Sequence, residues 1–143
     1  MRRLLAAVSA LIIIGCAASR PPETASGKAE VIIPRGEQQR FTDVLVKNAS
    51  EREYSVLEVT AYKAAFEKSG NFGMSLAYGE GSRRRLAFDF VPAGDSLRVV
   101  GRLEAVGARG NIEATRTGQD IYEFLMKTMA EFNAGPSSAP ILK

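Results

Sequence analysis

The feature that most constrains the fold is a pair of alternating segments joined by a short turn. In residues 85–91 apolar side chains occupy every second position, and residues 97–105 repeat the pattern. Residues 92–95 between them contain a proline and a glycine, which is typical of a turn. Because successive side chains of a strand point to opposite faces, each segment has one apolar face. We therefore expect an antiparallel hairpin whose apolar side covers the core.

Segments on both sides of this hairpin predict the rest of a small α+β domain. The expected elements are strands at 29–33, 53–58 and 62–68 and helices at 38–49 and 119–133. Each helix carries apolar residues three and four positions apart, which gives it one apolar stripe. The order β-α-β-meander-α predicts a single antiparallel sheet with two helices packed on one of its faces.

Residues 69–82 allow more than one interpretation. They contain four glycines among bulky apolar residues, which fits either a strand with bulges or a mobile loop. Phe72, Met74, Leu76 and Tyr78 alternate along the segment. On one face of an extended chain they would either close over a hydrophobic cavity or complete the core. Residues 107–118 are polar and predict a connection without regular structure.

The composition excludes most familiar enzyme chemistries. The chain has 143 residues, enough for one domain, with no histidine and one cysteine. Without histidine it cannot form a Ser-His-Asp or Cys-His nucleophilic system or most catalytic zinc sites. The acidic residues show no spacing typical of a calcium loop or a catalytic pair. We therefore expect a protein that is not an enzyme, with no catalytic residues, no metal and no cofactor.

The first sixteen residues have the pattern of an export signal. Arg2 and Arg3 precede an apolar run over residues 4–14, which is shorter than the roughly 20 residues that a membrane-spanning helix needs. The run ends in Ile13-Ile14-Gly15-Cys16, which resembles the lipobox of bacterial lipoproteins. That resemblance implies cleavage between Gly15 and Cys16 and acyl chains on Cys16, which would anchor the protein in a membrane.

The lipobox sets the expected organisation and location of the chain. The signal covers residues 1–15, an acylated cysteine and flexible tether 16–28, the α+β domain 29–133 and a flexible tail 134–143. Many enteric lipoproteins carry aspartate after the cysteine when they stay in the inner membrane, and here that residue is Ala17. We therefore expect the outer membrane, facing the periplasm. An exported and nearly neutral mature chain is not expected to bind nucleic acid.

The element order gives a second resemblance. Together with the lipobox and the tether, it resembles the helix-grip domains of periplasmic lipoproteins, including the one in the β-barrel assembly machinery. Residues 54–68, Asn71-Phe72 and Gly118-Gln119-Asp120 are also similar to uncharacterised envelope lipoproteins of proteobacteria. The resemblance implies a fold but no catalytic motif, because fold alone does not determine function.

Two groups of residues are candidates for contact surfaces. The expected last helix carries a second apolar stripe of Tyr122, Met126 and Met129, which either widens the core contact or meets a partner together with Phe72, Met74, Leu76 and Tyr78. Arg83-Arg84-Arg85 forms a dense basic run. It is either a solvated strand end or a contact for anionic lipid.

These observations lead to two hypotheses of function. The first is a non-enzymatic accessory or scaffolding module of a cell-envelope assembly, held at the membrane through the acyl chains on Cys16 and bound to an envelope protein. The alternative is a carrier or sensor that binds an apolar ligand, such as a lipid chain, between the sheet and the last helix. A carrier needs an enclosed cavity, whereas a scaffold needs an exposed patch.

Overall fold

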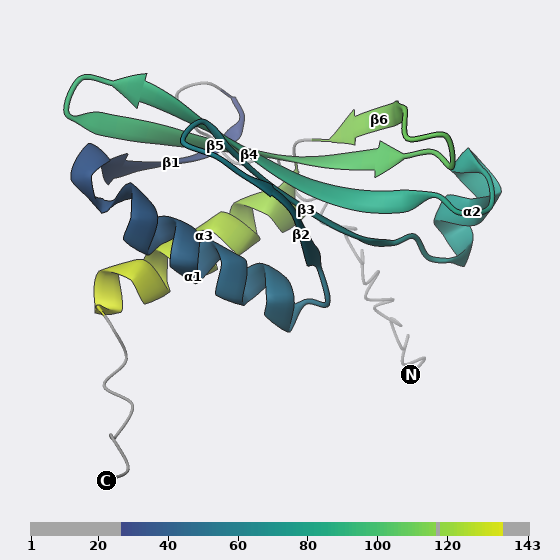
Figure 1. The fold of residues 1–143 in the computed structure, drawn as a ribbon, viewed down its shortest axis with the longest axis horizontal. Coiled ribbons are helices and arrows are strands. Elements are labelled where there is room, and N and C mark those ends of the chain that lie inside the picture. The colour runs from purple at the N-terminus through teal and green to yellow at the C-terminus, as the bar shows by residue number, and fades with distance from the viewer. Residues whose placement is uncertain (1–26, 117, 136–143) are drawn as a thin grey trace, which may run out of the picture.

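The computed structural model describes residues 27–116 and 118–135. The expected signal, Cys16, most of the tether and the chain beyond residue 135 lie outside the described residues. Within them, the fold is α+β, with one antiparallel sheet and two long helices on one of its faces, as the sequence predicts (Figure 1).

Long central strands build the sheet. The six strands are β1 Ala29–Pro34, β2 Ser55–Val59, β3 Lys63–Ser69, β4 Arg83–Ala93, β5 Ser96–Val106 and β6 Ile112–Arg116. β2, β3, β4 and β5 follow one another, and every pairing is antiparallel. β1 and β6 share the other edge of β5: β1 pairs with its first half and β6 with its second half. The expected hairpin is confirmed as β4 and β5, the two longest strands.

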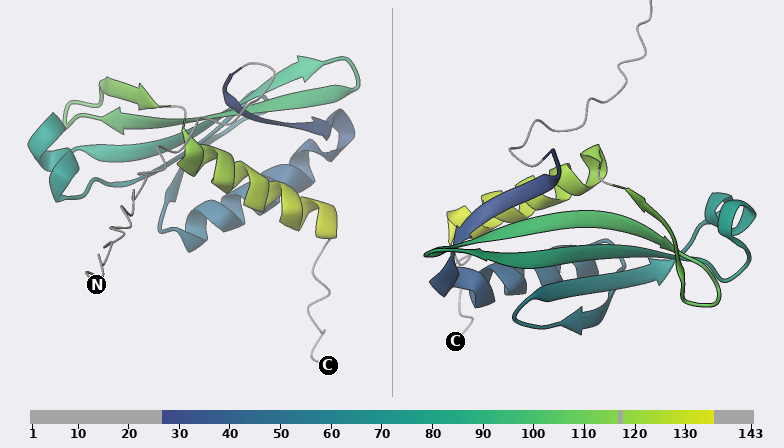
Figure 2. Two further views of the ribbon diagram at one scale, coloured as in Figure 1. Left: turned by 180° about the vertical axis from the view of Figure 1, so that it is seen from behind. Right: turned by 90° about the horizontal axis from the view of Figure 1, so that it is seen from above.

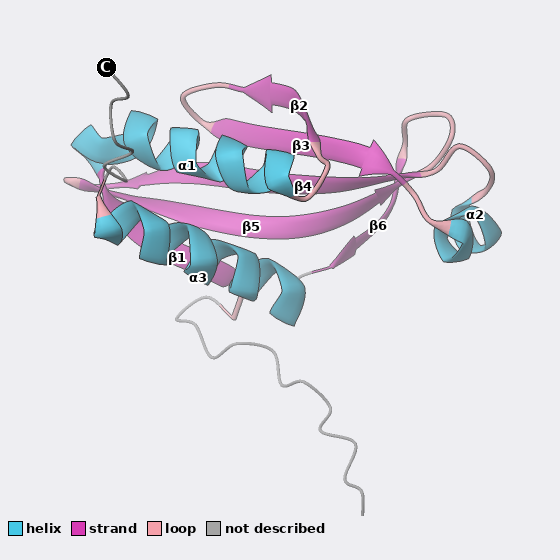
Figure 3. Ribbon diagram, turned by 90° about the horizontal axis from the view of Figure 1, so that it is seen from below, coloured by secondary structure: helices cyan, strands magenta, loops and turns pink. Residues whose placement is uncertain are grey.

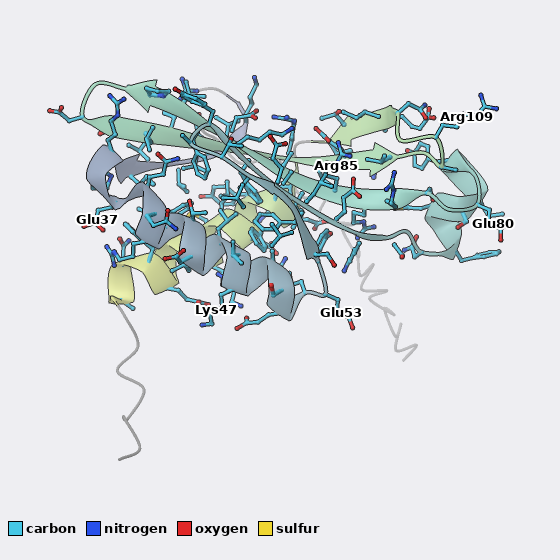
Figure 4. All side chains as sticks on the ribbon, in the orientation of Figure 1. Glu37, Lys47, Glu53, Glu80, Arg85 and Arg109 are labelled. Carbon is cyan, nitrogen blue, oxygen red and sulfur yellow. The ribbon has the colours of Figure 1, made fainter. Side chains whose placement is uncertain are left out.

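The helices lie at different places along these strands. α1 (Gln38–Glu51) follows a short 3-10 turn, Arg35–Glu37, and packs beside α3 (Gln119–Ala134). Both cover the same face at one end of the sheet, and α2 (Phe72–Tyr78) lies at the opposite end (Figure 3). Glu80 and Arg109 mark this α2 end, whereas Lys47 lies on α1 (Figure 4).

Two segments differ from the sequence prediction. Residues 72–78 form helix α2 rather than a strand or an open loop, because the Asn71 side chain accepts a hydrogen bond from the Met74 amide at 3.0 Å and so caps the first turn. The helix ends at Gly79, whose φ of 89° favours glycine. Residues 112–116 form strand β6 rather than an irregular connection. This short edge strand is mostly exposed, and only Ile112 and Ala114 give it apolar alternation, which is too short to distinguish a strand from a connection.

The core fills the space between the sheet and the helices α1 and α3. Phe88 of β4 stacks on Phe124 of α3 with ring centroids 5.5 Å apart, and Phe66 meets Phe88 edge-on at 6.1 Å. At Gly101 of β5, an added Cβ would lie 2.6 Å from Cγ2 of Ile121. α3 therefore rests directly on the backbone of β5.

Neither α1 nor α3 covers the opposite face of the sheet (Figure 2). That face carries a network of charged side chains. Glu104 of β5 is only 3% exposed, and it lies between Arg102 at 2.7 Å and Arg85 at 3.5 Å. Arg85 also contacts Glu67 of β3 at 2.5 Å, and Arg102 contacts Asp89 of β4. The alternating charges satisfy one another, which allows a carboxylate to be buried there.

Candidate functional site

The basic run Arg83-Arg84-Arg85 is divided between the two faces of the sheet. Arg83 and Arg85 lie on the open face and both pair with Glu67, at 3.3 and 2.5 Å. Arg84, which alternates with them, lies on the helix side and lines hollows there. The three arginines therefore do not form one basic surface.

The apolar candidates are also separated. Phe72 and Leu76 lie four positions apart on α2 and are 79% and 73% exposed, whereas Met74 is buried and Tyr78 half-buried. The expectation that these four side chains share one face is wrong, because a helix places alternate residues on different sides. On α3, a separate element, Met126 is exposed, whereas Tyr122 and Met129 pack against the core.

A hollow of about 230 Å³ lies beneath α2, on the face of the sheet that carries the helices. Its lining residues come from α2, β4, β5 and β6 and the residue before α2. In Figure 3, α2 lies at the end of the sheet away from α1 and α3. Small residues leave this space open, namely Gly73 and Ala77 on α2, Ala105 on β5 and Ala114 on β6. Met74, Tyr78 and Leu103 supply its larger apolar surface.

Two arginines line this hollow. The strand register pairs Ala105 of β5 with Arg84 of β4 on one side and Ala114 of β6 on the other. Arg116 of β6 pairs with Leu103, two residues before Ala105 on β5. Arg84 and Arg116 thus stand on strands to either side of β5, with backbones on the order of 10 Å apart. Both side chains are long enough to approach one ligand between them.

Two further hollows, of about 180 and 240 Å³, adjoin the first at Arg84. Lys68 lies with its Nζ 4.6 Å from the centre of the Tyr54 ring and donates to the Arg52 carbonyl at 3.1 Å. The guanidinium of Arg52 lies 4.9 Å from the Phe124 ring centre. Aromatic faces thus hold both cations in place. The acidic residues lining these two hollows are Glu53, Asp120 and Glu123.

Tyr54 is the group in this region with a displaced pKa. Burial raises the pKa of the Tyr54 hydroxyl, and the positive charge of Arg84, its hydrogen bond to the hydroxyl and the charge of Arg52 oppose the shift. The phenol therefore stays neutral at ordinary pH. It leaves the positive charge of Arg84 without a neutralising anion.

The cations of these hollows differ from most others in the domain. Among the described residues, none of Arg52, Lys68, Arg84 and Arg116 has a carboxylate oxygen within 4.0 Å. Elsewhere the paired cations are Arg40, Lys47, Lys63, Arg83, Arg85, Arg98, Arg102 and Lys127. Positive charge without a carboxylate partner therefore gathers around Arg84.

A second surface is the outer edge of β2. Every residue of this strand is exposed, including Val56, Leu57 and Val59, and no other described strand pairs with this edge. Tyr62 in the following turn is 71% exposed. The register with β3 shifts between Val56 and Glu58, so Leu57 is a bulge residue. Sequence reasoning placed this strand but missed that it lies at the edge.

Comparison with known protein families and curated proteins assigns the chain to no family. No protein-family model matches the chain, and a search of curated proteins finds no match. Over residues 27–116 and 118–135, no helix is long and apolar enough to cross a membrane. In the same residues, no group of three or more acidic, cysteine or histidine side chains is placed to hold a metal ion.

Proposed function

We propose that the protein is a lipid-anchored, non-enzymatic accessory module of a bacterial cell envelope. The anchor is supported by the sequence, in which the only cysteine, Cys16, follows a short apolar run. Residues 17–28 would then connect the anchor to the folded domain. At full extension, twelve residues reach about 40 Å, so the domain stays in a thin layer beside the membrane.

The exposed edge of β2 is the observation that supports a protein partner. An edge strand presents unpaired backbone N–H and C=O groups, which can pair with an extended segment of another protein. Proteins that avoid such pairing protect the edge with lysine, proline or a bulge, and of these β2 has only the bulge at Leu57. β2 instead exposes Val56, Leu57 and Val59, with Glu58 as its one charge. We take the partner to be an envelope protein that adds an extended apolar segment antiparallel to β2.

Anchoring and edge pairing act together in this proposal. A five-residue edge offers few contacts, so its affinity for a freely diffusing partner is low. Confinement by the acyl chains raises the local concentration of a membrane-bound partner, which compensates for a small interface. We place the module in the outer membrane facing the periplasm, following the sequence prediction.

Packing gives less support to a carrier that holds a lipid chain between the sheet and α3. Phe88, Phe124 and Ile121 fill that space, and Gly101 has no room for a single added carbon. To admit a chain, α3 would have to leave β5 and expose much of the core, at a large cost in free energy.

The anchor is tested by expressing the full chain with its export signal in a Gram-negative bacterium. Intact mass and detergent-phase partitioning are measured beside the Cys16→Ser variant. We expect wild type to begin at Cys16, to carry the mass of acyl chains and to enter the detergent phase, and the variant to keep the uncleaved signal. Cleavage at another site without added mass would show that the anchor proposal is wrong.

The partner surface is tested by photocrosslinking in the same cells. A photoreactive residue at Leu57 is compared with one at Gln39, an exposed position on α1. We expect a crosslink from Leu57 alone to an extended segment of one envelope protein, and its loss when Val56→Lys is added. Asp43→Lys on α1 adds the same residue away from the edge and should leave the crosslink unchanged. Equal crosslinking from both positions, or no effect of Val56→Lys, would contradict pairing through β2.

A further inference from the structure

The hollow beneath α2 combines an apolar surface with unpaired positive charge. Its apolar part comes from Met74 and Leu103, and Arg84 and Arg116 stand on strands to either side of β5. We propose that this hollow binds a small anionic amphiphile, with a carboxylate or phosphate between the two arginines and an apolar body beneath α2. This inference goes beyond the proposed function and depends neither on Cys16 nor on the β2 edge.

The size of the hollow limits the apolar body. A volume of about 230 Å³ corresponds to roughly eight water-sized groups at about 30 Å³ each. That is smaller than the pockets of about 300 to 1,000 Å³ that hold drug-sized ligands. The dimensions suit a chain or ring of about eight carbon atoms and are too small to enclose a complete phospholipid.

The charges select an anion at this hollow rather than at its neighbours. The acids Glu53, Asp120 and Glu123 line the two adjoining hollows but not this one. Glu104 of β5 also contributes to the lining, but strand alternation turns its carboxylate to the opposite face, where it contacts Arg85 and Arg102. Arginine recognises carboxylate and phosphate through paired N–H groups, and these contacts are stronger than neutral hydrogen bonds. Arg116 has no carboxylate partner among the described residues, and Arg84 is hydrogen-bonded only to the neutral hydroxyl of Tyr54, so neither positive charge is neutralised before an anion binds.

The two parts of the hollow act on different parts of the ligand. Burying an apolar body without an anionic head would leave the charges of Arg84 and Arg116 partly desolvated and unpaired, which is unfavourable. An anion without an apolar body would gain only contacts near solvent, which are weak. The structure therefore favours a molecule that has both parts over a molecule that has one.

The absence of tryptophan from the chain makes a direct test possible. A Tyr78→Trp substitution places a single fluorophore in the lining of the hollow. The full chain carrying this reporter, in phosphatidylcholine vesicles, is titrated with octanoate, octyl phosphate, acetate, inorganic phosphate and octyl glucoside. We expect a saturable blue shift with octanoate or octyl phosphate, at least tenfold weaker binding of acetate and phosphate, and no saturable response to octyl glucoside. The stronger of the two octyl probes identifies the head group.

Three variants of the reporter protein connect the response to the hollow. Arg116→Gln, on an exposed edge strand, should weaken octanoate binding about tenfold, because a charge-assisted contact is lost. Ala114→Leu should abolish binding with both arginines in place, because it fills the hollow. Arg35→Gln removes another arginine that has no carboxylate within 4.0 Å in the part of the chain that the structure describes. It lies far from α2 and should change nothing.

Defined results would overturn the inference. Equal responses to octanoate and octyl glucoside would mean that apolar contact alone drives the signal. Equal effects of Arg116→Gln and Arg35→Gln would mean that the arginines of the hollow are not involved. A folded reporter with no saturable response to either octyl anion would show that the hollow binds no such ligand. None of these results depends on acylation, which is read separately from the intact mass.

Discussion

The closest approach of helix and sheet, at Gly101, gives the sharpest stability prediction. In Gly101→Ala the new Cβ would lie 2.6 Å from Cγ2 of Ile121, 3.1 Å from Cε1 of Phe88 and 3.2 Å from Cδ1 of Leu125. These three side chains are almost fully buried and cannot turn away into solvent. Overpacking of this kind costs about 1 to 3 kcal/mol. Part of this cost is offset, because alanine loses less conformational entropy on folding than glycine does, which is worth about 0.5 to 1 kcal/mol in a strand.

We therefore expect Gly101→Ala to lower the free energy of unfolding by about 1 to 2 kcal/mol. For a domain of this size, that lowers the melting temperature by roughly 4 to 12 °C. Urea denaturation and thermal melting, both followed by circular dichroism, measure the two quantities. The overlap involves no charged group, so the effect should not depend on salt.

Gly36→Ala is the matched control. Gly36 also has an ordinary backbone conformation, but nothing lies within 4 Å of an added Cβ. The same chemical change there should leave the free energy of unfolding unchanged or raise it slightly. If Gly101→Ala is as stable as wild type, or Gly36→Ala loses as much stability, the reasoning about the contact between α3 and β5 is wrong.

Three other predictions follow from buried polar groups. Glu104→Gln removes the carboxylate between Arg85 and Arg102 and should cost about 1 to 3 kcal/mol in urea denaturation; an unchanged midpoint would refute its structural role. Because the pKa of Tyr54 is raised by burial, stability should fall as pH rises above about 10 through the folded-state pKa, and melting curves of Tyr54→Phe should lack that loss. The buried side-chain oxygen of Asn48 has no hydrogen-bond partner among the described residues, so Asn48→Leu should match or exceed wild-type stability in the same urea assay; a clear loss would contradict this.

The local pattern of apolar and polar residues predicted most of the helices and strands, because each has one face toward the core and one toward solvent. β4 and β5 each have one face on the core, so apolar residues alternate along them and their pairing could be expected. α1 and α3 each bury one stripe, which gives the spacing of three and four residues. An element with one buried face therefore shows a periodic apolar pattern in its sequence.

The pattern failed where that condition is absent. β6 is mostly exposed, and its two apolar residues, Ile112 and Ala114, are too few to distinguish a strand from a connection. In α2 the side chains of Phe72 and Leu76 face solvent, and apolar residues at every second position imitated a strand. The signal that could have identified this helix is Asn71 at its beginning, a residue favoured at helix N-caps.

The candidate sites depended on tertiary structure to a greater extent than the elements did. The three consecutive arginines form one basic run in the sequence. In β4, however, alternate side chains face opposite sides of the sheet, so Arg84 lies on the helix side, whereas Arg83 and Arg85 pair with Glu67 on the other face. Arg116 meets the same hollow only because β6 pairs with the second half of β5. Nothing in the sequence around residue 116 indicates that position.

The sequence by itself determined the α+β class, the central hairpin and the two long helices, because these depend on short-range periodicity and on burial of one face. The predicted lipid anchor also rests on the sequence alone. Only the tertiary structure decided that α3 fills the space over β5, that β2 is an open edge, and that Arg84 and Arg116 line one hollow. Those features depend on strand order and on side-chain volumes from segments far apart in the chain, which no local pattern encodes.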